Sequence, residues 1–348
     1  MKILQYKLNA IMAKSRAIYG KRLTGSDYEA LLGCTSVSDI TAYLRSTDAY
    51  SEILRKVPSA DISAGYLEFL IRKNKFEIFG RLSRYEMAFG QELYNYFVKS
   101  DEISYILFCI RNILLGKTRE NAVSAPQRYT VNQDSKLNQL TNAHTFNELI
   151  EALDTTPYKK LVEDCCRNNQ GDYFDFESEF TNYFNEYQFE LIKKTCGSDS
   201  GLMKLIKIKA DTGFIEKLCR IKEYYSVSSQ RLLHTSAPLH LTNFTQKQIQ
   251  ALISAADKKA VLEVLKSTAY REYASAIEQS EYIEQAVSAL NYKTYKHLLR
   301  FSTEPSEVLF CFMFLVENEV SNLIHIIEGV KYKMDAESIK KLLIGVGD

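Results

Sequence analysis

Three stretches of the chain repeat one pattern of apolar and polar positions. Each stretch contains a leucine, then a polar residue, then two apolar residues four positions apart, and finally a threonine. The spacing between these positions is the same in all three stretches, without a gap. Apolar residues four apart share one face of a helix, so the pattern predicts a short amphipathic helix before each threonine. We interpret the stretches as three copies of one unit. They are LLGCTSVSDITAYLRSTDAY at 31–50, LTNAHTFNELIEALDTTPY at 140–158 and LISAADKKAVLEVLKSTAY at 252–270.

The polar position of each copy predicts where its helix begins. Ser36, Thr145 and Asp257 occupy this position, and all three residue types accept hydrogen bonds from the free N–H groups of a helix start. Glu148 completes a capping box with Thr145, and Asp39 makes a weaker one with Ser36.

Further helices are predicted on both sides of each copy. The threonine is expected to cap a following helix, with a tyrosine inside its first turn, one position later in the first copy. A preceding helix is expected to begin at Ser26 in the first copy, with Glu29 completing the capping box. Ser135 and Thr245 take this place in the other copies, Thr245 two positions out of register. The threonine–tyrosine pairs are Thr47 and Tyr50, Thr156 and Tyr158, and Thr268 and Tyr270.

A long helix is predicted after each copy. Aromatic and aliphatic residues recur there at intervals of three and four with charged residues between them, which is typical of helices packed in a core. The predicted helices cover residues 67–97, 176–196 and 281–301.

A helix with an acid and an arginine is predicted after each long helix. Glu102 precedes Arg111 by nine positions, and Asp211 precedes Arg220 by the same interval. The interval is two and a half helical turns, so the two charges cannot pair within the helix. They either bind neighbouring units or a partner, or they are solvated surface charges. In the third copy Glu319 and Asn322 begin a similar helix without the arginine, and Arg16 is a candidate arginine for the first unit.

Composition narrows the class of protein. Proline and glycine are scarce, with 5 and 14 residues in 348, and both interrupt helices, so an all-α fold without flexible linkers is expected. The balance of 44 basic and 43 acidic residues excludes the basic surplus typical of nucleic-acid binding. The longest apolar run, Val308 to Val316, is shorter than the about 20 residues of a membrane-spanning helix.

The chain shows no motif for catalysis, cofactor or metal binding. Gly116-Lys117-Thr118 resembles the end of a phosphate-binding loop, but Arg111 stands where that loop needs a glycine. The histidines are not spaced as local metal ligands, and the seven cysteines lack a CxxC pair, as expected of reduced thiols in a cytosolic protein. We therefore predict no catalytic, cofactor-binding or metal-binding residues.

Several segments together resemble the C subunit of V/A-type ATPases, the counterpart of the d subunit in eukaryotic V-ATPases. The resemblance covers essentially the whole chain and rests on the order and threefold spacing of its motifs. The Ile324-His325 pair departs from the family, which usually carries an arginine there, so no anion contact is assigned to it. The segments are Arg16, RLTGSDYEALL at 22–32, the threonine–tyrosine motifs at 44–50, 153–158 and 265–270, the acid-to-arginine helices and Glu319-x-x-Asn322-Leu323-x-x-Ile326.

The resemblance implies a non-catalytic central-stalk subunit. Family members are three similar helical bundles around a pseudo-threefold axis, shaped like a funnel, here expected at residues 1–100, 101–209 and 210–348. They sit on the cytoplasmic face of the membrane sector and pass torque between the D- and F-type stalk subunits and the proteolipid ring, which couples ATP turnover to H⁺ or Na⁺ transport. No small-molecule substrate is implied. Candidate stalk-interface residues are Glu102, Arg111, Asp211, Arg220, Glu319 and Asn322.

Two alternative functions are compatible with the pattern. A free-standing scaffold would stack the three units in an open array. An all-helical enzyme with a dispersed active site would hydrolyse a phosphoester without a partner.

Overall fold

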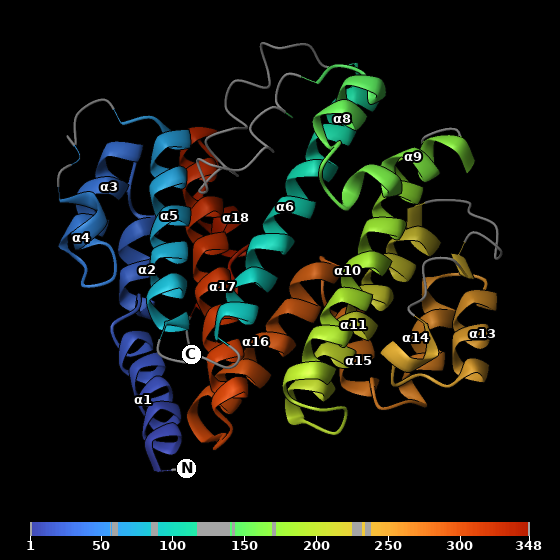
Figure 1. Ribbon diagram of the computed structural model, residues 1–348. Helices are drawn as coiled ribbons and strands as arrows, with labels where there is room; N and C mark the ends of the chain where they lie inside the picture. The colour runs from blue at the N-terminus through green and yellow to red at the C-terminus, as the bar shows by residue number, and fades with distance from the viewer. Residues whose placement is uncertain are drawn as a thin grey trace. The chain divides into compact units, whose positions relative to one another are not determined.

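The computed structural model describes residues 2–55, 57, 62–84, 90–116, 140, 143–168, 172–224, 232–233 and 238–346. Regular structure in these ranges is helical, without a strand, which confirms the all-α prediction (Figure 1). Lys117, Thr118, Ser135 and His234 lie outside the described residues. The chain forms two compact units, unit 1 with residues 1–176 and 295–348 and unit 2 with residues 177–294.

Long helices come in consecutive pairs, one pair for each copy of the repeat. The pairs are α5 (Ala64–Ser83) with α6 (Gly90–Leu114), α10 (Tyr173–Thr195) with α11 (Gly201–Tyr224), and α16 (Ile283–Phe301) with α17 (Pro305–Lys331). The second helix of each pair carries the acid of the acid-to-arginine pattern.

The prediction of one continuous helix over 67–97 is wrong. The ring centroids of Phe76 and Tyr94 lie 6.2 Å apart, and those of Phe79 and Phe97 lie 5.0 Å apart. Eighteen residues of one helix would span about 27 Å, so α5 and α6 fold back on each other. The apolar spacing continues on both sides of the turn, which is why the pattern did not reveal it.

Short helices surround the threonine turns. In the first copy they are α2 (Gly25–Leu32), α3 (Val37–Ser46) and α4 (Ser51–Leu54). The second copy contains α8 (Phe146–Ala152) and α9 (Tyr158–Asn168). The third contains α13 (Gln246–Ser254), α14 (Lys258–Lys266) and α15 (Arg271–Gln279), preceded by the short 3-10 helix η3 (Leu239–Leu241).

The predicted caps of the central short helices are confirmed. The side chains of Ser36, Thr145 and Asp257 each accept a hydrogen bond from the backbone N–H three residues later. Thr145 forms the full capping box with Glu148.

One predicted cap is wrong. Helix α2 is capped by Thr24, with Asp27 completing the box, and not by Ser26. Thr24 precedes Thr47 by the same interval that separates Thr245 from Thr268, so the corrected cap removes the apparent shift in register between the first and third copies.

The threonine of each turn closes the helix before it. The hydroxyls of Thr47, Thr156 and Thr268 donate at 2.7–2.8 Å to the leucine carbonyls three residues earlier. Thr156 and Thr268 also accept from the N–H of the following tyrosine. The prediction that the threonines cap the next helix is wrong for Thr47 and Thr268, because Tyr50 and Tyr270 hold the N-cap positions of α4 and α15.

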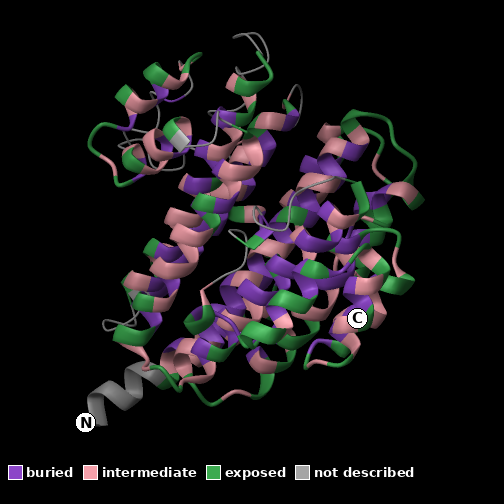
Figure 2. Ribbon diagram, turned by 90° about the vertical axis from the view of Figure 1, so that its right-hand side faces the viewer, coloured by how far each residue is buried: buried purple, intermediate pink, exposed green. Residues whose placement is uncertain are grey.

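Helix α17 is the centre of unit 1. Figure 1 shows it beside α1 (Lys2–Tyr19) and α5. Figure 2 colours buried positions purple, and they recur along the packed helices. Among the described helices α17 is the one long and apolar enough to span a membrane, yet 67% of its most apolar window is buried in the chain, as in a core helix. Aromatic rings fix its first turns against α6 and α16, namely Tyr96, Phe97, Tyr295, Phe310 and Phe314.

The C-terminal segment packs on the second half of α17. Helix α18 (Ala336–Lys340) places Ile339 so near α17 that a Cβ at Gly329 would lie 2.5 Å from its side chain. Asn322 pairs with the backbone of Ile344 in both directions, at 2.8 and 3.0 Å.

Unit 2 packs its short helices on α11. The ring of Phe244 contacts Tyr270 at 4.8 Å between centroids and Phe214 at 6.5 Å. These contacts bring the third threonine turn against the buried side of α11, where Asp211 lies.

Candidate functional site

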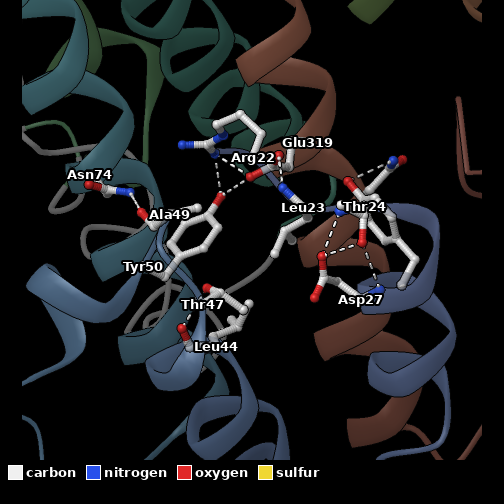
Figure 3. A network of polar contacts seen from close by, with 12 residues as sticks. Arg22, Leu23, Thr24, Asp27, Leu44, Thr47, Ala49, Tyr50, Asn74 and Glu319 are labelled. Carbon is white, nitrogen blue, oxygen red and sulfur yellow. Dashed lines mark hydrogen bonds and ion pairs between the residues drawn. The ribbon is translucent and has the colours of Figure 1, made fainter. Parts of the chain in front are cut away.

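The first group of functional interest surrounds Glu319 of α17 (Figure 3). Its carboxylate forms a buried ion pair with Arg22, which precedes α2. It accepts a hydrogen bond of 2.7 Å from the hydroxyl of Tyr50, in the first threonine turn, and one of 3.2 Å from the N–H of Leu23. Glu319 of the last copy therefore binds both the segment before α2 and the threonine turn of the first copy.

The protonation of this group follows from its surroundings. Burial opposes the charge of Arg22, but Glu319, with smaller contributions from Tyr50 and Tyr28, more than offsets that effect and raises the pKa of Arg22 above its ordinary value. Burial raises the pKa of the Tyr50 hydroxyl well above its usual range; Arg22 opposes this rise and Glu319 adds to it. Arg22 is therefore charged and Tyr50 remains a donor at physiological pH.

The second group surrounds Asp211 of α11, which is 1% exposed. Its carboxylate accepts hydrogen bonds from the hydroxyls of Thr242 and Tyr270, and from the backbone and side-chain N–H groups of Asn243 at 2.9 and 3.1 Å. Burial raises the pKa of Asp211, and these donors oppose the rise. The buried acid is thus held by four donors from the third copy, without a cation among them.

The third group is simpler. Glu102 of α6 accepts a hydrogen bond of 2.7 Å from the hydroxyl of Tyr158, which begins α9. The ammonium of Lys99 lies 5.2 Å from the centre of the Tyr158 ring. Glu102 is half-buried, whereas Asp211 and Glu319 are buried.

These three groups follow one rule, and we call them the acid–tyrosine joints. The acid of each long second helix accepts a hydrogen bond from the threonine-turn tyrosine of the next copy, and the last acid binds the first tyrosine. The extra residue between Thr47 and Tyr50 does not prevent the contact. The joints are Glu102 with Tyr158, Asp211 with Tyr270, and Glu319 with Tyr50.

The acids and the arginines face opposite ways. Nine residues turn a helix through two and a half turns, so Arg111 and Arg220 lie on the sides of α6 and α11 opposite the joints. Arg111 is exposed, with its guanidinium 5.6 Å from the centre of the Phe108 ring. Arg220 lies 3.5 Å from Glu177 of α10 and 3.7 Å from Glu284 of α16.

The remaining sequence candidates hold parts of unit 1 together. Asn322 binds the C-terminal segment. Arg16 donates at 2.8 and 2.7 Å to the carbonyls of Leu299 and Ser302, at the end of α16. His325 contacts the backbone of the C-terminal segment, and burial lowers its pKa, so the imidazole is neutral at pH 7.

A buried lysine was not found from the sequence. Lys75 of α5 lies 3.3 Å from Asp101 of α6 and 3.0 Å from Glu317 of α17. Burial opposes its charge, but the two carboxylates outweigh this effect and raise the pKa of Lys75. In the sequence, Lys75 lies next to Phe76 within an apolar helix face, and this position could have indicated that the lysine is buried.

One carboxyl in unit 2 should make stability depend on pH. Burial, strengthened by the charge of Glu284 and opposed by Arg220, raises the pKa of Glu216 to about 8. The pKa of Glu216 is thus higher in the folded than in the unfolded chain. The protonated carboxyl therefore stabilises the folded state below about pH 4.5, and this contribution is lost as the pH rises through 8. We expect Glu216→Gln to flatten this decline and to raise the free energy of unfolding at pH 8.5 by a few kcal/mol, in urea unfolding followed across pH.

Glu190→Gln, on the surface of α10, is the matched control for this measurement and should follow the wild-type pH profile. A Glu216→Gln profile parallel to that of the wild type would contradict the assignment.

No group of three or more potential metal-ligating side chains occurs among the described residues. The joints combine carboxylates, phenols and one arginine inside the chain, which suits mechanical linkage between helices. The chemistry of these groups is that of buried hydrogen bonds and ion pairs.

Comparisons with known proteins agree on one family. The profile of the ATP synthase (C/AC39) subunit family matches residues 11–342. The C subunit of the A-type ATP synthase of Methanosarcina acetivorans is 22% identical over 355 residues, which covers 96% of this chain and 91% of that protein.

Proposed function

The chain belongs to the ATP synthase (C/AC39) subunit family, and on that premise we propose that it is the rotor adaptor of a V/A-type ATPase. In this role it links the D- and F-type subunits of the central stalk to the proteolipid ring. It passes torque between them and has no catalytic site or cofactor of its own. It works at the cytoplasmic face of the membrane sector.

The observation that carries this proposal is the order of the acid–tyrosine joints. Each copy of the repeat is tied to the next, and Glu319 ties the last copy to the first. We propose three bundles, at residues 1–100, 101–209 and 210–348, around a pseudo-threefold axis. With these bounds the first two joints lie within the second and third bundles, and the joint of Glu319 with Tyr50 ties the third bundle to the first. A contact between the first and last bundles is expected of a closed ring, whereas the end bundles of an open array do not meet.

We propose that the stalk is bound on the side of the helices that carries the arginines. On α6 this side carries Arg111, and on α11 it carries Arg220, which also pairs with Glu177 and Glu284. Glu102 and Asp211 contribute from within the chain by fixing α6 and α11, the helices that present the arginines. Glu319 and Asn322 contribute by fixing α17 in unit 1.

Co-purification tests the proposal. A tagged chain, extracted from its native membranes in mild detergent, is expected to bring down both stalk subunits and the proteolipid. Complexes that lack the chain should hydrolyse ATP without driving ion transport. Recovery of the chain with neither partner, or transport that proceeds without the chain, would overturn the proposed role.

Solution scattering separates the rotor adaptor from the free-standing scaffold. A closed body of this length has a radius of gyration of about 20 Å, whereas an open array of the same units is longer. An ATPase assay on the purified chain addresses the enzyme alternative, and we expect no turnover.

A further inference from the structure

The outward side of α6 carries an apolar stripe with one cation in its middle. At intervals of three and four, the residues of this stripe share one face over three turns. Leu114 and Leu115 are 40% and 59% exposed, and Arg111 lies at the centre. We call these residues the α6 stripe: Ser104, Leu107, Phe108, Arg111, Leu114 and Leu115.

The equivalent side of α11 is charged, and its side chains form ion pairs with other helices of unit 2. Lys217 lies 3.1 Å from Glu177, and Arg220 reaches the same carboxylate and that of Glu284. Glu223 lies 2.9 Å from Lys258 of α14. Charged side chains of other helices therefore pair with this face of α11, while Tyr224 in its last turn is 68% exposed.

The equivalent side of α17 meets the C-terminal segment in its middle turns, while Tyr332 at its end is 67% exposed. Ile324 packs against the core of unit 1, and His325 contacts the backbone of Leu342. On the equivalent faces of α11 and α17 the middle turns therefore meet other segments of the chain, and the exposed last turns carry Glu223 with Tyr224 and Lys331 with Tyr332. The α6 stripe differs because its exposed last turn carries two aliphatic side chains, Leu114 and Leu115.

We propose that the α6 stripe is the docking surface for a helix of the central stalk, with an apolar face and a carboxylate directed at Arg111. This inference rests on the proposed function. The α6 stripe is about 17 Å long, which suits two or three turns of an amphipathic helix. Such a helix recognises a partner by apolar residues at intervals of three and four.

Charge selects the same partner. Arg111 is the one charged residue between Ile103 and Gly116, and no carboxylate of the described residues lies within ion-pair distance of it. An arginine surrounded by apolar side chains is a frequent centre of binding energy at interfaces. A partner helix with an acid between apolar residues complements it, and a basic partner is disfavoured.

Binding of the full-length chain to the co-expressed D- and F-type stalk subunits tests the inference. The double variant Leu114→Glu with Leu115→Glu is expected to bind about 30-fold or more weakly, and Arg111→Glu about 10-fold. The matched control is Tyr332→Glu with Met334→Glu, at the end of α17, where the side chains are 67% and 43% exposed. Control binding should stay within about threefold of wild type, and circular dichroism should show unchanged helicity in all variants.

A photo-crosslinking amino acid at position 115 identifies the occupant. A crosslink to a stalk subunit supports the inference. Crosslinks confined to the proteolipid, or to residues 117–139 of this chain, overturn it, as does equal weakening by the α17 control.

If the wild-type chain binds the stalk and the α6 variants bind equally well, the inference fails while the proposed function stands. If the wild-type chain binds no ATPase subunit, the proposed function itself fails.

Discussion

Alanine in place of Glu319 is expected to lower the free energy of unfolding by about 3–5 kcal/mol. The substitution leaves the guanidinium of Arg22 buried without its carboxylate, and it removes the acceptor of the Tyr50 hydroxyl. Breaking one side of a buried ion pair costs more than the pair contributes, because the remaining charge stays desolvated. Urea unfolding at pH 7, followed by circular dichroism, measures the change.

Two companion variants separate this explanation from a simple loss of packing. Glu102→Ala, at the half-buried joint without a cation, should cost only about 1 kcal/mol. The double variant Arg22→Met with Glu319→Leu should recover most of the stability lost by Glu319→Ala, since it removes both charges. A double variant as unstable as Glu319→Ala would show that the charge of Arg22 is not the cause.

The second large effect is expected at Lys75. Lys75→Met should destabilise unit 1 by about 3–5 kcal/mol at pH 7, because Asp101 and Glu317 then lose the buried ammonium that pairs with both, and the charge of Arg72 offsets only part of that loss. Both carboxyls should bind protons more readily in the folded variant than in the unfolded chain, so their folded pKa values lie above the unfolded ones. Such groups supply stability at low pH and lose it as the pH rises, so the deficit should shrink between pH 7 and pH 4.5.

Lys73→Met is the matched control on the same helix. Lys73 is exposed and lies 3.9 Å from Glu77, and such surface pairs contribute about 0–1 kcal/mol. Urea unfolding of both variants at pH 7 and 4.5 checks the prediction. A Lys75→Met deficit that does not change with pH would assign the loss to packing.

Local features of the fold could be predicted from the sequence. Caps depend on side chains within three residues of a helix start, so Ser36, Thr145 and Asp257 were identified correctly. The choice of Ser26 over Thr24 failed because both residues begin an acceptable capping box and only the position of the chain before α2 distinguishes them.

Partners distant in the sequence could not be predicted. The motif tyrosines and the acids were found separately, but nothing in a linear pattern indicates that Tyr50 binds Glu319 at the other end of the chain. The turn between α5 and α6 was missed for a similar reason, since periodicity records the face of a helix but not where the chain reverses. Buried Lys75 was missed because its two carboxylates come from other helices.

The contact between Arg22 and Glu319 spans 297 positions. At about 5–20 residues per second, a ribosome needs about 15–60 seconds to synthesise the residues between them. Unit 2 is continuous in sequence, whereas unit 1 is assembled from both ends of the chain. The order of folding during synthesis is therefore reversed: the middle of the chain can reach its final contacts first, and the N-terminal helices wait for the last hairpin to emerge.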